Sequence, residues 1–233
     1  MITVQPILFT RRPEEWQRIA AALGLVPPYP PSRGWAEFEG RGIFAIHATC
    51  EGHREESVEL NILVENLDQT EANLENAGYP VNRRMLGEGP VVDVDVSSGA
   101  KLTIASGARP ATTGPLSIGT IWFQDDYEEP QAIFEHLGLR ETIASERGTW
   151  HVFSADGGGI AQIHEGTAPR QELSFEYDGE VNDLAFQLEE AGIDASVTDE
   201  AYGRALRIQT PGGCELWINQ KQTDFYGYQN LEN

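Results

Sequence analysis

A fourfold repeat constrains the fold of this 233-residue chain more than any other feature of its sequence. Four segments with apolar residues at helical spacing each end on a glycine, and these glycines are Gly24, Gly78, Gly138 and Gly192. The spacing between them is 54, 60 and 54 residues. Acidic residues early in each segment favour a helix N-terminus, and a glycine just after the last turn accepts the left-handed conformation that closes a helix. The pattern predicts four helices in four related units.

A strand-like run precedes each predicted helix, at residues 3–10, 57–65, 116–124 and 172–177. Shorter β-type runs, broken by glycine or turn residues, follow each helix. In the first unit, the segment VPPYPPSRG (26–34) is too rich in proline for a central strand, because proline lacks the amide hydrogen that a sheet needs. The sequence therefore predicts an α+β fold built from four βαβββ modules.

A longer repeat relates the two halves of the chain. GRGIFAIH, ending at His47, matches GGGIAQIH, ending at His164, at an offset of 117 residues. We therefore expect two tandem domains, residues 1–107 and 115–221, with a linker at 108–114 and a tail at 222–233. The tail carries three aromatic residues that we expect to pack on the body of the protein: Phe225, Tyr226 and Tyr228.

Composition limits the partners of the chain. It has 37 acidic against 16 basic residues, a net charge of −21, which repels phosphate backbones and acidic membrane surfaces. No apolar run approaches the roughly 20 residues that span a bilayer, and the N-terminus lacks the order of a signal peptide. Cys50 and Cys214 form no zinc or redox motif. We therefore expect a cytoplasmic protein with free thiols that binds neither nucleic acid nor membranes.

Paired β-α-β-β-β units resemble the vicinal oxygen chelate (VOC) superfamily, which includes glyoxalase I, bleomycin-resistance proteins, fosfomycin-resistance transferases and extradiol dioxygenases. The resemblance covers nearly the whole chain, and its strongest segments are SVELNILVENLDQTEANLENAGYPV, QELSFEYDGEVNDLAFQLEEAGIDA and TPGGCELWI. It implies two tandem glyoxalase-like domains, each with a curled mixed sheet around a cavity. It does not fix the function, because the superfamily includes isomerases, transferases, ring-cleaving oxygenases and pure binders.

In metal-using relatives, the ligands are His, Gln or Glu residues on the first and last strands of each module. Counting back from the helices places the matching positions of domain two at Ile118 or Ser117, Ala161 or Gln162, Glu172 and Glu215. The matching positions of domain one fall near Val4, Ala45, Glu59 and Lys101. Isoleucine cannot bind a metal, and a protonated lysine beside a glutamate forms an ion pair instead. We therefore expect no metal in domain one and a degenerate site in domain two. The alternative is a divalent ion held by Gln162, Glu172 and Glu215 with waters.

The candidate ligand-binding residues are polar or aromatic side chains on the expected strands of domain two: Trp122, Trp150, Gln162, His164, Glu172, Glu215 and Trp217. Gln162 and His164 are two residues apart and so share a strand face. Each tryptophan can instead belong to the sheet core, His164 can lie at a strand end near water, and either glutamate can point to solvent. If the two glutamates face each other without a cation, one must hold a proton or meet an arginine.

These features predict a protein that binds a small organic molecule, cationic or aromatic, in the cup of domain two, without a cofactor, in the manner of bleomycin-resistance relatives. A second hypothesis is a lyase, isomerase or dioxygenase of the same superfamily that uses a divalent ion at Glu172 and Glu215. A third is a structural protein whose cups are filled by side chains and whose surfaces bind partners. Tandem domains can imitate the dimer of single-domain relatives, so a monomer and a homodimer both fit the sequence.

Overall fold

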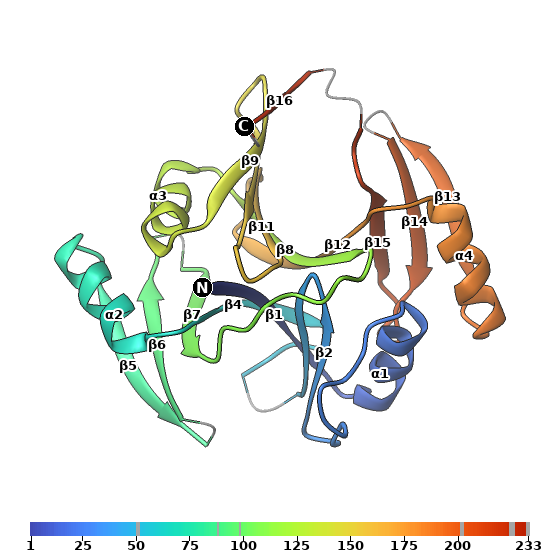
Figure 1. The fold of residues 1–233 in the computed structure, drawn as a ribbon, viewed down its shortest axis with the longest axis horizontal. Coiled ribbons are helices and arrows are strands. Elements are labelled where there is room, and N and C mark those ends of the chain that lie inside the picture. The colour runs from blue at the N-terminus through green and yellow to red at the C-terminus, as the bar shows by residue number, and fades with distance from the viewer. Residues whose placement is uncertain (50–51, 88, 98, 201–202, 224–226, 232–233) are drawn as a thin grey trace.

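The structure is a computed structural model that describes residues 1–49, 52–87, 89–97, 99–200, 203–223 and 227–231. It contains two mixed sheets (Figure 1). The first has the spatial order β2 (Trp35–Gly40), β3 (Gly42–Ala48), β1 (Ile2–Thr10), β4 (Ser57–Val64), β7 (Lys101–Ser106), β6 (Gly89–Asp95) and β5 (Val81–Leu86). The second has the order β13 (Ala195–Glu200), β14 (Gly203–Gln209), β15 (Glu215–Gln220), β12 (Arg170–Tyr177), β8 (Leu116–Gln124), β11 (Ile160–Glu165), β10 (Trp150–Ser154), β9 (Arg140–Ser145) and β16 (Tyr228–Asn230).

The four predicted helices are present as α1 (Pro13–Ala22), α2 (Leu67–Asn76), α3 (Glu128–Leu137) and α4 (Val181–Glu190). All four predicted glycines have positive φ, between +76° and +94°. After each one, the next amide donates back to a carbonyl in the last turn of the helix, as Leu25 N does to Ala20 O at 3.1 Å. The repeat of the sequence is therefore a repeat of one C-terminal capping motif. None of the helices in the described part of the chain is long and apolar enough to cross a membrane.

The strands confirm the α+β fold of four related modules, with one expected exception. The proline-rich segment 26–34 forms only an isolated bridge between Val26 and Glu39. Strands before residue 107 belong to the first sheet and strands after residue 115 to the second. The division into two domains at these positions stays a proposal. Of the tail, Tyr228 lies in β16 of the second sheet, whereas Phe225 and Tyr226, like Cys50, lie outside the described residues.

The helices cover the outer faces of the sheets, α1 beside α4 and α2 beside α3 (Figure 1). Each pair of helices sits over a hydrophobic core that both sheets share. One core joins Trp16 and Phe44 of the first half to Phe175 and Leu184 of the second, and the other joins Ile62 to Phe134 in the same way. The second sheet curls into a U-shaped wall with α3 and α4 outside it (Figure 1). We call the surface without helices the helix-free face of each sheet.

Two glycine turns join the halves of the chain. They are the matching segments of the long repeat, and Val4 N donates to Gly158 O at 2.9 Å while Ile118 N donates to Arg41 O at 2.8 Å. The turns meet so closely that a Cβ placed on Gly42 would lie 2.9 Å from Gly159 Cα. The two halves thus exchange the same backbone contact about an approximate two-fold axis, and the contact leaves no room for side chains.

An ion cluster at Asp178 also joins the two halves. Asp178 Oδ2 accepts hydrogen bonds from Lys221 Nζ and Arg41 Nη1, both at 3.0 Å, and these two bonds hold the pKa of Asp178 below its usual range. Because the pKa is lowered in the folded state, this stabilisation is complete above the ordinary aspartate pKa and is lost as the pH falls through the lowered value.

We expect Asp178→Asn to lower the free energy of unfolding at pH 7 by at most about 1 kcal/mol, because the side chains of the cluster are about 40% exposed and solvent screens them. Urea unfolding of both proteins between pH 7 and pH 2.5 measures the difference. It should shrink toward zero at the acid end, and a difference that is independent of pH would contradict this assignment.

Candidate functional site

The register of the second sheet places the predicted metal-ligand positions in one row on the helix-free face. Gln162 pairs with Ile121, and Ile121 pairs with Glu172 on its other side. Directly paired residues point to the same face of a sheet. The first-strand position is therefore Ile121, and the prediction of Ile118 was wrong, because Ile118 is fully buried in the core on the opposite face. Ser117 shares the helix-free face but lies four residues before Ile121 in the strand.

The same correction applies to the first sheet. Ile7 pairs with both Ala45 and Glu59, whereas Val4 is fully buried in the shared core. Counting from the helix misplaced both positions by three residues, because pairing with the neighbouring strands sets the register and the helix does not. The expected ion pair is present, with Lys101 Nζ 2.9 Å from Glu59 Oε1.

The residues in the row of the second sheet do not fit a divalent ion. Ile121 has no donor atom. Gln162 is almost fully buried, and its amide accepts from Trp150 Nε1 at 3.1 Å and donates to Ser174 Oγ at 2.8 Å. Such ions need several oxygen or nitrogen ligands, and the described residues contain no group of three or more His, Cys, Asp or Glu side chains that could hold one. Gln162 instead ties three strands together as a neutral hydrogen-bonding group.

The two glutamates of the row are separated by a gap in the sheet. β12 and β15 pair only over three residues, from Phe175 to Tyr177 against Ile218 to Gln220. Beyond that, a cavity of about 480 Å³ lies between the strands, and both Glu172 and Glu215 line it. Each glutamate lies near an arginine: Glu172 Oε1 accepts from Arg170 Nε at 2.6 Å, and Glu215 Oε2 lies 3.9 Å from Arg207 Nη1.

The cavity has a polar side and an apolar side. From the helix-free face it is lined by Glu172, Ser174, Glu215, Trp217 and Asn219, and from the core side by Leu8, Trp16, Val58, Leu173 and Leu216. A mixed lining of this kind is typical of sites for small organic molecules, where apolar surface gives affinity and a few polar groups fix the orientation.

Glu56 closes one end of the cavity and has φ of +57°, which is unusual for a residue with a side chain. Its carboxylate accepts three hydrogen bonds, from Trp16 Nε1 at 2.9 Å, Thr210 Oγ1 at 2.6 Å and Gly212 N at 2.7 Å. These donors come from both halves of the chain. Glu56 therefore fixes the cavity wall, and its acceptor atoms are already in use.

The seven predicted ligand-binding residues do not all meet at this cavity. Glu172, Glu215 and Trp217 line it, while Gln162 and Trp150 form a hydrogen-bonded pair on the same face. His164 shares this face but lies at an exposed strand end. Trp122 was predicted wrongly, because it pairs with Ile163 and Gln171 on the opposite face and is fully buried against Phe134.

Sequence reasoning missed three residues beside the site. The guanidinium carbon of Arg170 lies 3.7 Å from the ring centroid of Phe123, and that of Arg207 lies 5.1 Å from the centroid of Trp217. Tyr228 packs edge-on against Trp150, with ring centroids 5.4 Å apart. The one available signal was in ALRIQT, where a single arginine, Arg207, alternates with apolar residues inside a strand.

The helix-free face of the first sheet carries a charged network around Arg109. Arg109 Nε and Nη2 donate to Glu39 and Glu37, both at 2.6 Å, and its backbone bonds Thr3 Oγ1. Burial alone would lower the pKa of Arg109, but the hydrogen bonds to the two glutamates outweigh it and raise that pKa. Gln5 extends the network by donating to Glu37 Oε1 at 2.9 Å. Arg109 thus neutralises two carboxylates of β2 on this face.

No family model and no characterised protein sequence matches the chain. Its structure is similar to a catechol 2,3-dioxygenase, with a TM-score of 0.64 and 15% identity over 98% of this chain and 94% of that one. The 2,3-dioxygenase LapB from Pseudomonas sp. KL28 has a TM-score of 0.65 and 15% identity over 96% of this chain and 92% of that one. The Mn(II)-bound glyoxalase from Novosphingobium aromaticivorans has a TM-score of 0.62 and 17% identity over 94% of this chain and 81% of that one. The chain therefore has the fold shared by these dioxygenases and this glyoxalase.

Proposed function

We propose that this chain is a binding protein for a small organic molecule, held in the cavity between β12 and β15 of the second sheet. The observation that carries the proposal is a cavity of about 480 Å³ with a tryptophan and several polar groups, at the row where metal-using proteins of this fold hold their ion. Here the row contains an isoleucine, a glutamine that is hydrogen-bonded to Trp150 and Ser174, and two glutamates beside arginines. In the first sheet, the positions that match Glu172 and Glu215 hold Glu59 and Lys101, which form an ion pair at 2.9 Å.

An aromatic ligand fits the site better than a cationic one. A cation would be held by an exposed aromatic face, but arginine guanidinium groups already lie over Phe123 and Trp217. Trp217 also lines the cavity, where its ring can stack on a flat, uncharged ring system.

Ligand binding is tested by a thermal-shift screen of small aromatic compounds, because a ligand that binds only the folded state must stabilise it, by about 2.7 kcal/mol at 100 times Kd. Trp217→Leu should weaken binding of any hit at least tenfold, since it removes the stacking surface, while Trp35→Leu in the first sheet should leave it unchanged. Equal effects of the two variants, or no hit at all, would contradict the proposal.

The second candidate is a metal-dependent lyase, isomerase or dioxygenase. One observation favours it: Gln162, Glu172 and Glu215 have ligand-type side chains on the helix-free face, and a glyoxalase of the same fold binds Mn(II). Metal analysis of the purified protein separates the two candidates. A stoichiometric ion that Glu215→Ala removes would establish the enzyme, and a protein that stays metal-free after incubation with Mn²⁺ or Fe²⁺ would leave binding.

A further inference from the structure

The two sheets contain the same pair of parallel strands, but the pair is zipped to different lengths. In the first sheet β4 pairs with β7 from Leu60 onward, whereas in the second β12 pairs with β15 only from Phe175 onward. Leu173 is the counterpart of Leu60 in the repeat. Glu215 is the counterpart of Lys101 on the neighbouring strand. The cavity of the second sheet therefore lies where the first sheet is still closed.

A side-chain amide closes this point in the first sheet. Gln171 reaches across from β12, where its Oε1 accepts from Leu60 N at 2.8 Å and its Nε2 donates to Lys101 O at 2.9 Å. A primary amide carries an acceptor and two donors on one planar group. One such group can therefore join the N–H of one strand to the carbonyl of the next.

The second sheet has a valine where the first receives this glutamine. SVEL (57–60) of β4 matches RQEL (170–173) of β12, so Val58 is the counterpart of Gln171. Val58 lines the cavity from the core side, but valine has no side-chain atom that forms a hydrogen bond. Leu173 and Glu215 also line the cavity, and neither is fully buried. By the shared register, Leu173 N points toward β15 as Leu60 N points toward β7.

We infer that the cavity takes a small aromatic primary carboxamide, whose amide has the place in the second sheet that the Gln171 amide has in the first. Its oxygen accepts from Leu173 N, its nitrogen donates to Glu215 O, and its ring stacks on Trp217. This inference rests on the proposed function and names the class of its ligand.

The charge of the lining favours an amide over an acid of the same shape. Glu56, Glu172 and Glu215 all line the cavity, so a carboxylate ligand would meet like charges. A carboxylate also has no hydrogen to donate to a backbone carbonyl. A neutral amide meets neither obstacle.

The first test compares ligands that differ only in the group on the ring. Isothermal titration of the wild-type protein should show that benzamide binds at least about tenfold more tightly than acetophenone, in which a methyl group replaces the amide nitrogen, and than benzoate. Benzamidine should also bind more weakly, because it has no oxygen for Leu173 N. Tighter binding of benzamidine would assign the site to cations and overturn the inference, as would equal binding of benzamide and acetophenone.

The second test supplies the missing bridge from the protein itself. Val58→Gln should weaken benzamide binding at least about tenfold relative to Val58→Met, because the two side chains have similar lengths and only glutamine competes for the same backbone groups. Without ligand, Val58→Gln should unfold at a midpoint about 2–4 °C above that of Val58→Met. A glutamine that finds no partner in this half-buried place would be the less stable of the two, so the reverse order would overturn the inference.

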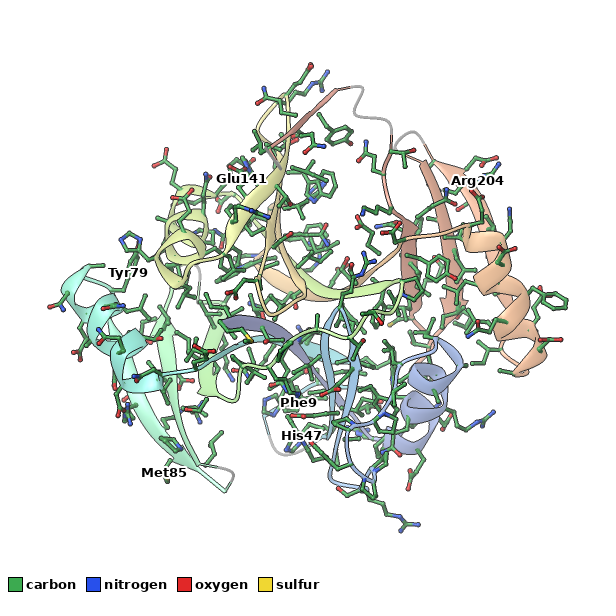
Figure 2. All side chains as sticks on the ribbon, in the orientation of Figure 1. Phe9, His47, Tyr79, Met85, Glu141 and Arg204 are labelled. Atoms are coloured by element: carbon green, nitrogen blue, oxygen red, sulfur yellow. The ribbon has the colours of Figure 1, made fainter. Side chains whose placement is uncertain are left out.

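A failure of the carboxamide inference differs from a failure of the proposed function. Aromatic binding that Trp217→Leu weakens, but that does not distinguish benzamide from acetophenone, would overturn the inference and leave the proposed function standing. The absence of binding by any aromatic compound would overturn both. The control for Trp217→Leu is Tyr79→Leu, because Tyr79 lies on the opposite side of the molecule from α4, with its ring edge-on to His136 (Figure 2). Tyr79→Leu should leave the affinity for benzamide unchanged.

Discussion

Gly159→Ala is expected to lower the free energy of unfolding by about 3 kcal/mol or more. Gly159 has φ of +91°, and the left-handed region costs a residue with a side chain roughly 1–2 kcal/mol. A Cβ there would also lie 2.6 Å from Val4 Cβ and 3.1 Å from Ile118 O, so the joint between the halves must open. Overpacking of this kind costs typically 1–3 kcal/mol more. Guanidinium unfolding followed by fluorescence and circular dichroism measures the loss.

Gly213→Ala is the matched control, because it isolates the backbone term. Gly213 has nearly the same φ, +90°, but no atom lies within 4 Å of an added Cβ. We expect Gly213→Ala to cost only the strain of the positive φ, about 1–2 kcal/mol. The difference between the two variants measures the close contact at the joint, and equal losses would show that this contact does not stabilise the protein.

The helices and the module order could be predicted because their signals are local. A glycine one or two positions after the last helical residue determines the cap wherever the helix lies, so the four glycines located four helices without any tertiary information. The proline-rich segment 26–34 failed to form a strand for an equally local reason. The repeated turns GRG and GGG were recognisable as turns, but nothing local indicated that Gly42 and Gly159 meet each other.

The face that a strand residue occupies could not be predicted with the same certainty. A shift of an odd number of residues moves a side chain to the opposite face of the sheet, so the three-residue miscount between Ile118 and Ile121 exchanged a core residue for a site residue. Trp122 failed for the same reason, since an aromatic residue suits the core and the cavity equally well. Pairing between strands that are more than 40 residues apart decides which face a side chain occupies. This pairing cannot be read from a single sequence.

The composition of the site was predictable in part. The carboxylates Glu172 and Glu215 both line the cavity, with Arg170 2.6 Å from Glu172 and Arg207 3.9 Å from Glu215, whereas the sequence argument required a proton or an arginine at only one of them. Neither arginine was predicted at the site. Arg207 lies on another strand than Glu215, so the sequence alone does not bring these two side chains together.

Arg109→Ala is expected to lower the free energy of unfolding by about 2–3 kcal/mol. The side chains of Glu37 and Glu39 are only 12% and 22% exposed, and both lie on the first sheet with Arg109 as their shared partner. Removing one partner from a fully buried pair costs about 3–5 kcal/mol, because the remaining charge stays desolvated, and partial exposure reduces that figure here. Chemical denaturation at pH 7 measures the effect. Arg33→Ala, which removes a 93% exposed side chain paired only with Glu14, should cost no more than about 0.5 kcal/mol.

A second substitution shows whether the uncompensated carboxylates cause the loss. In the Arg109→Ala protein, adding Glu37→Gln removes one of the two charges while keeping an oxygen that accepts from Gln5 Nε2, which donates at 2.9 Å in the wild type. The double variant should therefore recover about 1 kcal/mol or more relative to Arg109→Ala, although Glu37→Gln alone destabilises the wild type by breaking the bond to Arg109. If the double variant instead loses the sum of the losses of Arg109→Ala and Glu37→Gln, Arg109 stabilises the first sheet through its packing and not through its charge.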